Sequence, residues 1–158
     1  MFIDVPIEDT PLTTVALGHK ERCDIVAQVA KEKFVPQDYL NLLIISEGGK
    51  KGSTVRNSNG SYDLGVAQVN TIHASFIEKK YPGSTWQDVA LDPKLNISIS
   101  ADIFRRCLNH PLVKNNVWEG VGCYNSMTVN VRTPYVYRTM KVWDRINKSA
   151  ELSCQKYW

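Results

Sequence analysis

The pattern of apolar and polar positions predicts a chain built mainly of helices. After an irregular lead-in over residues 1–19, apolar side chains recur every three or four positions from about residue 20 to residue 33. This spacing is typical of an amphipathic helix. Pro36 then opens a second segment, in which the apolar run Leu42–Ile45 leads almost directly into Glu47. Because two glycines follow and end the segment, the pattern places Glu47 at the C-terminal end of a buried helix.

The stretch from residue 49 to residue 70 has a different character. Gly, Ser and Asn dominate it, and Asn59 with Gly60 forms a strong turn dipeptide. Beyond this turn, Tyr62 and Leu64 flank a polar residue, as in a short strand. We therefore predict a loop or small hairpin inserted beside the preceding helix, rather than a linker between domains.

Helical patterns resume after the insert. Thr85 and Asp88 have the spacing of a capping box, and Asp92 before Pro93 is a typical helix start. The predicted helical segments are residues 71–80, a segment after Thr85, 93–109, 116–124 and 133–148. A length of 158 residues suits a single domain with one core. The sequence thus predicts one mainly α domain over residues 20–150, between the lead-in and a tail of residues 151–158.

Charge and hydropathy narrow the class of protein. The chain has 19 basic and 16 acidic residues, and the basic ones are scattered, which gives no support for nucleic-acid binding. A mild positive excess favours encounter with a polyanionic surface. The longest apolar run, Leu40–Ile45, is far too short to span a bilayer, so stable membrane insertion is not expected. Residues 1–14 lack a basic segment followed by an apolar one, and no signal peptide is visible.

The cysteines leave two interpretations open. None of them has CxxC spacing, and His73 and His110 lack acidic or thiol partners at ligand spacing, so no metal site is expected. Disulfides would permit three pairings, of which Cys23 with Cys154 would close the longest loop and clamp the two ends of the chain. Buried thiols are the alternative, with Cys123 the foremost candidate. The four cysteines are Cys23, Cys107, Cys123 and Cys154.

Glu47 is the strongest candidate for chemistry. The apolar run before it suggests that its carboxyl lies at the edge of the core. Partial burial disfavours the charged form of a carboxyl, and the negative end of the helix dipole acts in the same direction. A carboxyl that keeps its proton near neutral pH can act as a general acid on a glycosidic oxygen. Without further information, a solvated glutamate at a helix end is the alternative.

Four motifs occur in order along the chain: Glu47-Gly48-Gly49, Gly65-Val66-Ala67-Gln68-Val69-Asn70, Leu91-Asp92-Pro93 with Asn96-Ile97, and Gly122-Cys123-Tyr124-Asn125-Ser126. Together they resemble the soluble lytic transglycosylase family of the lysozyme-like superfamily, especially its small wall-cutting members that accompany conjugation and secretion machines. The resemblance covers about residues 20–148. It implies a mainly α, lysozyme-like α+β domain of the goose type, with the hairpin insert beside the catalytic helix and no cofactor.

The resemblance also implies roles for particular residues. Glu47 would be the single catalytic acid and base. The substrate-binding residues would be Gln68, Asn70, Tyr124, Asn125 and Tyr135, with Tyr137 as the alternative to Tyr135. The enzyme would cut peptidoglycan glycan strands without water and leave 1,6-anhydromuramic ends. It would act in the periplasm, or otherwise outside the cytoplasm, where it could open the wall for a cell-envelope transport machine.

Departures from the family pattern keep two other functions open. Gly48 replaces a serine, and Val66-Ala67 replaces a Leu-Met pair, which leaves room for a non-catalytic glycan-binding or assembly protein on the same fold. A hydrolytic muramidase would need a second placed carboxylate. Asp63 is the candidate, although its neighbourhood of turn-forming residues favours a backbone role.

Overall fold

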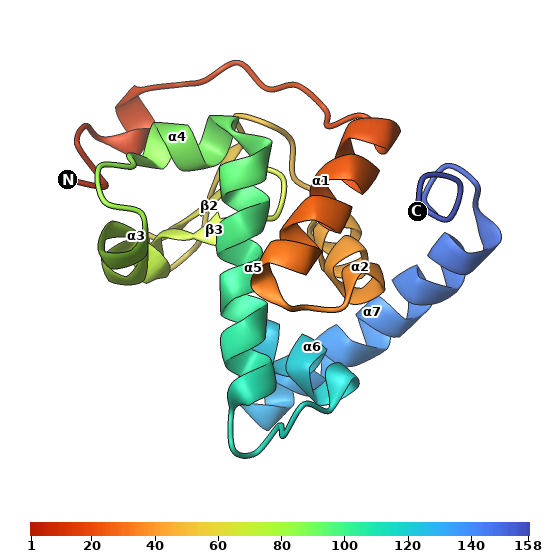
Figure 1. Ribbon diagram of the computed structural model, residues 1–158. Coiled ribbons are helices and arrows are strands. Elements are labelled where there is room, and N and C mark those ends of the chain that lie inside the picture. Colours follow the sequence, from red (N-terminus) through yellow and green to blue (C-terminus); the bar gives the residue numbers. More distant parts are fainter.

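The computed structural model describes residues 1–158 and is mainly helical, with one small sheet (Figure 1). The α-helices are α1 (His19–Lys33), α2 (Gln37–Glu47), α3 (Ala74–Lys80), α4 (Trp86–Leu91), α5 (Pro93–Asn109), α6 (Val117–Asn125) and α7 (Val129–Lys148). Two short 3-10 helices are η1 (Ile7–Asp9) and η2 (Thr71–His73). The antiparallel sheet has the order β1-β2-β3, formed by β1 (Thr54–Arg56), β2 (Tyr62–Leu64) and β3 (Val69–Asn70). The predicted mainly α fold with a small hairpin insert is confirmed.

Local capping signals fix several helix ends as predicted. Thr85 and Asp88 form a reciprocal capping box at α4, and the Asp92 carboxylate accepts from two backbone N–H groups at the start of α5. The last helix is longer than predicted, because it begins at Val129 and contains Pro134 within its first two turns. Pro134 is the sixth residue of α7 and removes one intrahelical hydrogen bond, yet the helix continues through it.

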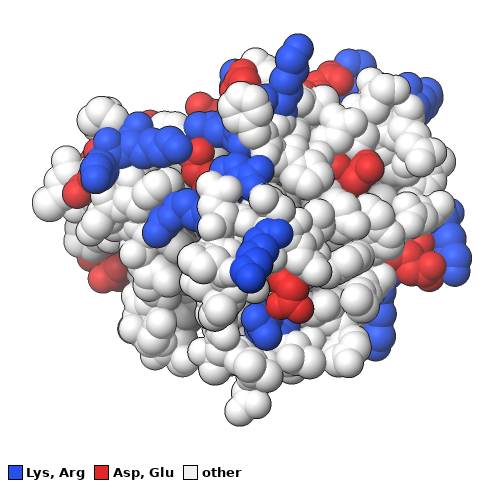
Figure 2. All heavy atoms as spheres, turned by 60° about the horizontal axis from the view of Figure 1, so that its bottom comes forward, with Lys and Arg blue, Asp and Glu red and all other residues white.

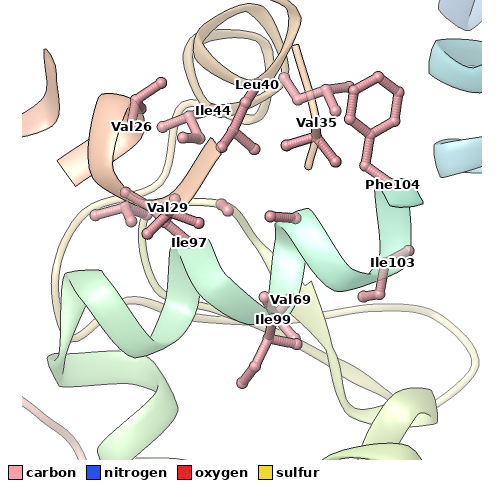
Figure 3. Close-up of a cluster of buried hydrophobic side chains, with 14 of the residues drawn as sticks. Val26, Val29, Val35, Leu40, Ile44, Val69, Ile97, Ile99, Ile103 and Phe104 are labelled. Atoms are coloured by element: carbon pink, nitrogen blue, oxygen red, sulfur yellow. The ribbon is translucent and has the colours of Figure 1, made fainter. Parts of the chain in front are cut away.

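The core lies around the long helix α5. Its apolar side chains meet those of α1 and α2 on one side and the β3 residue Val69 on another (Figure 3). Ile97 and Phe104 of α5, Val29 of α1 and Leu40 of α2 are all fully buried. Because residues 40–44 of α2 are buried, the position of its C-terminal end, Glu47, is fixed by core packing rather than by a loop.

Asn96 of α5 ties the insert to the helices. It is fully buried, and its side-chain oxygen accepts from the Ala67 backbone N–H at 2.8 Å. Its amide nitrogen donates to the backbone carbonyls of Leu64, at 2.7 Å, and Val89, at 2.9 Å. One side chain therefore satisfies three backbone groups, which lie in β2, in the turn after β2 and in α4.

Replacing Asn96 with alanine is expected to lower the free energy of unfolding by about 3 kcal/mol or more, because three buried backbone groups lose their partners at once. Urea denaturation measures this loss. The exposed Asn109 at the end of the same helix gives a matched control, Asn109→Ala, whose effect should stay within about 0.5 kcal/mol. Equal effects of the two variants would contradict the bridging role of Asn96.

Both chain ends pack onto this domain. Phe2 and Ile7 of the lead-in are buried in the main core. At the other end a disulfide joins Cys23 of α1 to Cys154, as the clamp interpretation predicted. A second disulfide joins Cys107 of α5 to Cys123 of α6, so the alternative of a buried free thiol at Cys123 was wrong. The short distance between those two helices brings the two sulfurs together.

The surface carries charges of both signs. Figure 2 shows lysine and arginine side chains interspersed with acidic ones and separated by large uncharged areas on the face that it views. None of the helices is at once long and apolar enough to cross a membrane.

Candidate active site

A cleft of ≈ 500 Å³ opens between the insert, α5, α6 and the start of α7. Most of its wall is polar, with uncharged amide and hydroxyl side chains, and its apolar part is contributed mainly by isoleucine and valine. The lining residues are Glu47, Asn57, Ser58, Asn59, Ser61, Asp63, Gln68, Val69, Asn70, Ile72, His73, Ile103, Tyr124, Asn125 and Val131. Such a surface suits an uncharged, hydroxyl-rich ligand better than a polyanion.

Two glycines set the position of Glu47 at the edge of this cleft. Gly48 has a φ of 67°, the left-handed conformation that ends α2 immediately after Glu47. A Cβ on Gly49 would lie 2.0 Å from the Gly65 carbonyl oxygen, so only glycine permits this close approach. The Gly49 N–H donates to the Val66 carbonyl at 3.2 Å. The helix end is thereby fastened to the segment that carries Gln68.

The environment of Glu47 favours its protonated form. Burial is the largest cause and raises the pKa of the Glu47 carboxyl, and the negative charge of Asp63 acts in the same direction. The Tyr135 hydroxyl donates to Glu47 Oε1 at 3.0 Å and, together with the charge of Arg138, opposes the rise in pKa. Burial is the larger effect, so the pKa of Glu47 is raised and the protonated form that a general acid needs is favoured.

Replacing Tyr135 with phenylalanine should raise the pKa of Glu47 further, because the hydrogen bond that stabilises the carboxylate is lost. If Glu47 must be protonated to act, activity falls as the pH rises through its pKa. The alkaline limb of the pH–rate profile should therefore move to higher pH in this variant. The matched control is Tyr137→Phe, at an exposed position on the same helix. An unmoved limb in Tyr135→Phe would contradict the electrostatic role of Tyr135.

Tyr135 was predicted to bind substrate, and the structure places it elsewhere. It is 3% exposed and does not line the cleft, and its hydroxyl contacts the catalytic candidate. Burial and the charge of Glu47 raise the pKa of Tyr135, so its hydroxyl stays protonated and able to donate. No local sequence signal could reveal this contact, because 88 positions separate the two residues.

Tyr124 and Asn125 lie where the sequence placed them, on the cleft wall at the end of α6. The Tyr124 hydroxyl lies 2.8 Å from the hydroxyl of Ser100, a fully buried residue of α5. Burial, followed by the charge of Glu47, raises the pKa of Tyr124. Tyr124 is therefore a neutral hydroxyl close enough to Glu47 to feel its charge.

Gln68 and Asn70 also line the cleft, but protein groups occupy much of their hydrogen-bonding capacity. The Gln68 amide nitrogen donates to the Gly65 carbonyl, at 2.9 Å, and to Ser53 Oγ, at 3.2 Å, which leaves the amide oxygen available. Asn70 donates to Asp63 Oδ1 at 2.8 Å and to Ser61 Oγ, while its oxygen caps η2 at Ile72. Asn70 therefore mainly positions the carboxylate of Asp63.

Asp63 is the residue that the sequence interpretation misplaced. It belongs to β2 and not to the turn, which is formed by residues 57–60. Its side chain accepts from the side chain of Asn70 instead of serving the backbone, and it lines the cleft with Glu47. The register pairs Asp63 with Val55 and with Asn70, which sets the face on which its side chain lies.

The histidines offer no ligand cluster at the cleft. His73 lies in its wall, where burial and then the charge of Arg106 lower the pKa of the imidazole. His110 instead accepts from the Leu112 backbone N–H. The only close group of ligand types is His19 with Cys23 and Cys154, and its two sulfurs are joined in a disulfide.

Helices around a small antiparallel sheet, with a partly buried carboxyl at a helix end facing a polar cleft, define a domain with the lysozyme-like fold. The chain belongs to the family described as "Transglycosylase SLT domain", whose profile matches residues 24–141. This membership confirms the resemblance seen in the four motifs.

Two named bacterial proteins are similar in sequence to this chain. The chain is 29% identical to "Invasion protein IagB" of Salmonella typhi over 108 residues, which cover 68% of this chain and 64% of that protein. It is 26% identical to "Protein IpgF" of Shigella flexneri over 113 residues, which cover 71% of each. The chain thus spans slightly less than two thirds of the length of IagB and 71% of the length of IpgF.

Proposed function

We propose that this protein is a peptidoglycan lytic transglycosylase. The observation that carries the proposal is the Glu47 carboxyl, which burial biases toward its protonated form and which the Tyr135 hydroxyl stabilises once ionised. Membership of the SLT family and the uncharged polar cleft support a glycan strand as the substrate. The bond cut would be the β-1,4 link between N-acetylmuramic acid and N-acetylglucosamine.

In this mechanism Glu47 gives its proton to the bridging oxygen as that oxygen leaves the anomeric carbon. The carboxylate so formed then takes the proton of the muramic 6-hydroxyl while the 6-oxygen bonds to the same carbon. One bond breaks, one forms and the proton returns to Glu47, so no water is consumed. The product is a 1,6-anhydromuramic end. Tyr135 stabilises the carboxylate between the two steps.

A hydrolytic muramidase is the second candidate, and the position of Asp63 favours it. A carboxylate in the same cleft as Glu47 could activate water or stabilise a cation at the anomeric carbon. Asp63→Asn separates the two mechanisms, because asparagine has the same shape and can still accept from Asn70. Fragments released from purified peptidoglycan are then identified by mass spectrometry.

For a lytic transglycosylase, Asp63→Asn should still release anhydromuramic ends. The pKa of Glu47 should fall, because a negative charge that raises it is removed, and the alkaline limb of the pH–rate profile should move to lower pH. Reducing ends from the unmodified protein, with a loss of about 10²–10⁴-fold in the variant, would instead assign hydrolysis with Asp63 as a catalytic group.

A non-catalytic wall-binding or assembly protein on the same fold is the remaining alternative, favoured by Gly48 in place of the family serine. The left-handed conformation of Gly48 is one that a serine adopts only at a cost, and glycine supplies no hydroxyl on the C-terminal side of Glu47. Saturable binding to peptidoglycan without released fragments would assign that role.

The place of action follows from the substrate. Because peptidoglycan lies outside the cytoplasmic membrane, we propose that the protein acts in the periplasm or is otherwise exported. The relative named invasion protein supports a further step, in which the enzyme opens the wall locally for a cell-envelope transport machine.

A further inference from the structure

A second pocket lies behind the end of α2, on residues that do not overlap with the catalytic cleft. It has a volume of ≈ 260 Å³ and is lined in part by Gly48 and Gly49. Aliphatic side chains supply most of its remaining wall, including Ile44, Val66 and Leu152. Two cationic residues, Arg22 and Lys50, also line it, and no acidic residue does.

Arg22 is an unusual residue in this position. Arg22 is only 9% exposed, yet no carboxylate lies within ion-pair distance of its guanidinium. Buried charges in proteins are normally paired. Burial lowers the pKa of the Arg22 guanidinium, as expected for a cation that has lost water without gaining an anion.

The hydrogen bonds of Arg22 account for only part of its guanidinium. Nε donates to Asn41 Oδ1 and Nη2 donates to the Leu152 carbonyl, each at 3.0 Å. Nη1 has no hydrogen-bond partner in the protein, and it remains in contact with solvent. The free side of the guanidinium therefore remains accessible.

We propose that this pocket binds the carboxyl-terminal residue of a peptide that ends in a small apolar side chain. The carboxylate would accept from Arg22 Nη1 with the Lys50 ammonium nearby, and the apolar side chain would lie against the aliphatic wall. A volume of ≈ 260 Å³ is below the range of about 300–1,000 Å³ of typical ligand pockets, which suits a small terminal group rather than a glycan strand. The site is independent of the proposed chemistry at Glu47.

Two kinds of peptide present this chemistry: wall stem peptides, which end in D-alanine, and protein C-termini, which end in L-residues. The probes are therefore N-acetyl-D-alanyl-D-alanine and N-acetyl-L-alanyl-L-alanine, each beside its carboxamide. Binding is followed by NMR of the ¹⁵N-labelled protein. The backbone signals of Gly48 and Gly49 and the Arg22 Nε–H signal should shift, while those of Asn59 and Asn125 in the catalytic cleft should not.

At least one acid should bind about tenfold or more tightly than its carboxamide, because the amide lacks the charge that Arg22 leaves unpaired. The handedness preferred identifies the source of the ligand. Ala16→Trp should abolish binding by filling the pocket without removing Arg22, and Thr14→Trp, at an exposed position outside the pocket, should not. No binding of either acid, equal binding of acids and carboxamides, or binding that survives Ala16→Trp would overturn the proposal.

Discussion

Glu47→Gln is expected to lower the rate of peptidoglycan cleavage by about 10²–10⁴-fold, the range over which general acid catalysis accelerates reactions. Glutamine matches the shape of glutamate and can still accept from Tyr135, but it can neither give nor take the proton of the reaction. Because the same group is proposed to act in both steps, the substitution removes the acid and the base together. Release of anhydromuramic fragments, counted by mass spectrometry, measures the loss.

The stability of this variant separates a catalytic role from a structural one. Burial raises the pKa of Glu47, so its ionised form is disfavoured in the folded protein, and a neutral amide at this position should not lower the melting temperature. Glu32→Gln, at an exposed position on α1, is the matched control and should retain full activity. Full activity of Glu47→Gln would remove Glu47 from the mechanism, and unfolding would show that the carboxyl serves the fold.

Local patterns predicted the fold well wherever a helix end depends on neighbouring residues. The caps at Thr85 and Asp92 act within three positions, so the sequence alone reveals them. The packing of the lead-in depends instead on distant partners. The Trp86 indole donates to the carbonyl of Val5, 81 positions away, and Phe2 enters the core. No periodicity in residues 1–19 indicates such contacts.

The same distinction applies to the candidate site. An apolar run and two glycines sufficed to place Glu47 at a buried helix end, because both signals are local. Two of the three groups that tune its pKa, Tyr135 and Asp63, could not be found in this way. The contact between Tyr135 and Glu47 requires α2 and α7 to meet. The position of Asp63 depends on strand register, because a shift of one residue would turn its side chain to the opposite face of the sheet.

Of the two disulfides, Cys23–Cys154 should contribute more to the stability of the fold. It joins residues 131 positions apart, whereas Cys107 and Cys123 are 16 positions apart. The chain entropy that a cross-link removes from the unfolded state grows with the length of the closed loop. It corresponds to about 5 kcal/mol for the longer loop and about 3 kcal/mol for the shorter one. For a protein of this size the longer loop alone represents a large part of the usual stability.

Cys23→Ser with Cys154→Ser should therefore lower the melting temperature by roughly 10–20 °C, and more than Cys107→Ser with Cys123→Ser. The tail would keep three hydrogen bonds to α1, from His19, Arg22 and Trp158, so it should remain docked at low temperature and detach on heating. Calorimetry of both double variants measures the difference. If the short-loop variant lost more stability, local packing between α5 and α6 would outweigh loop closure as the source of the effect.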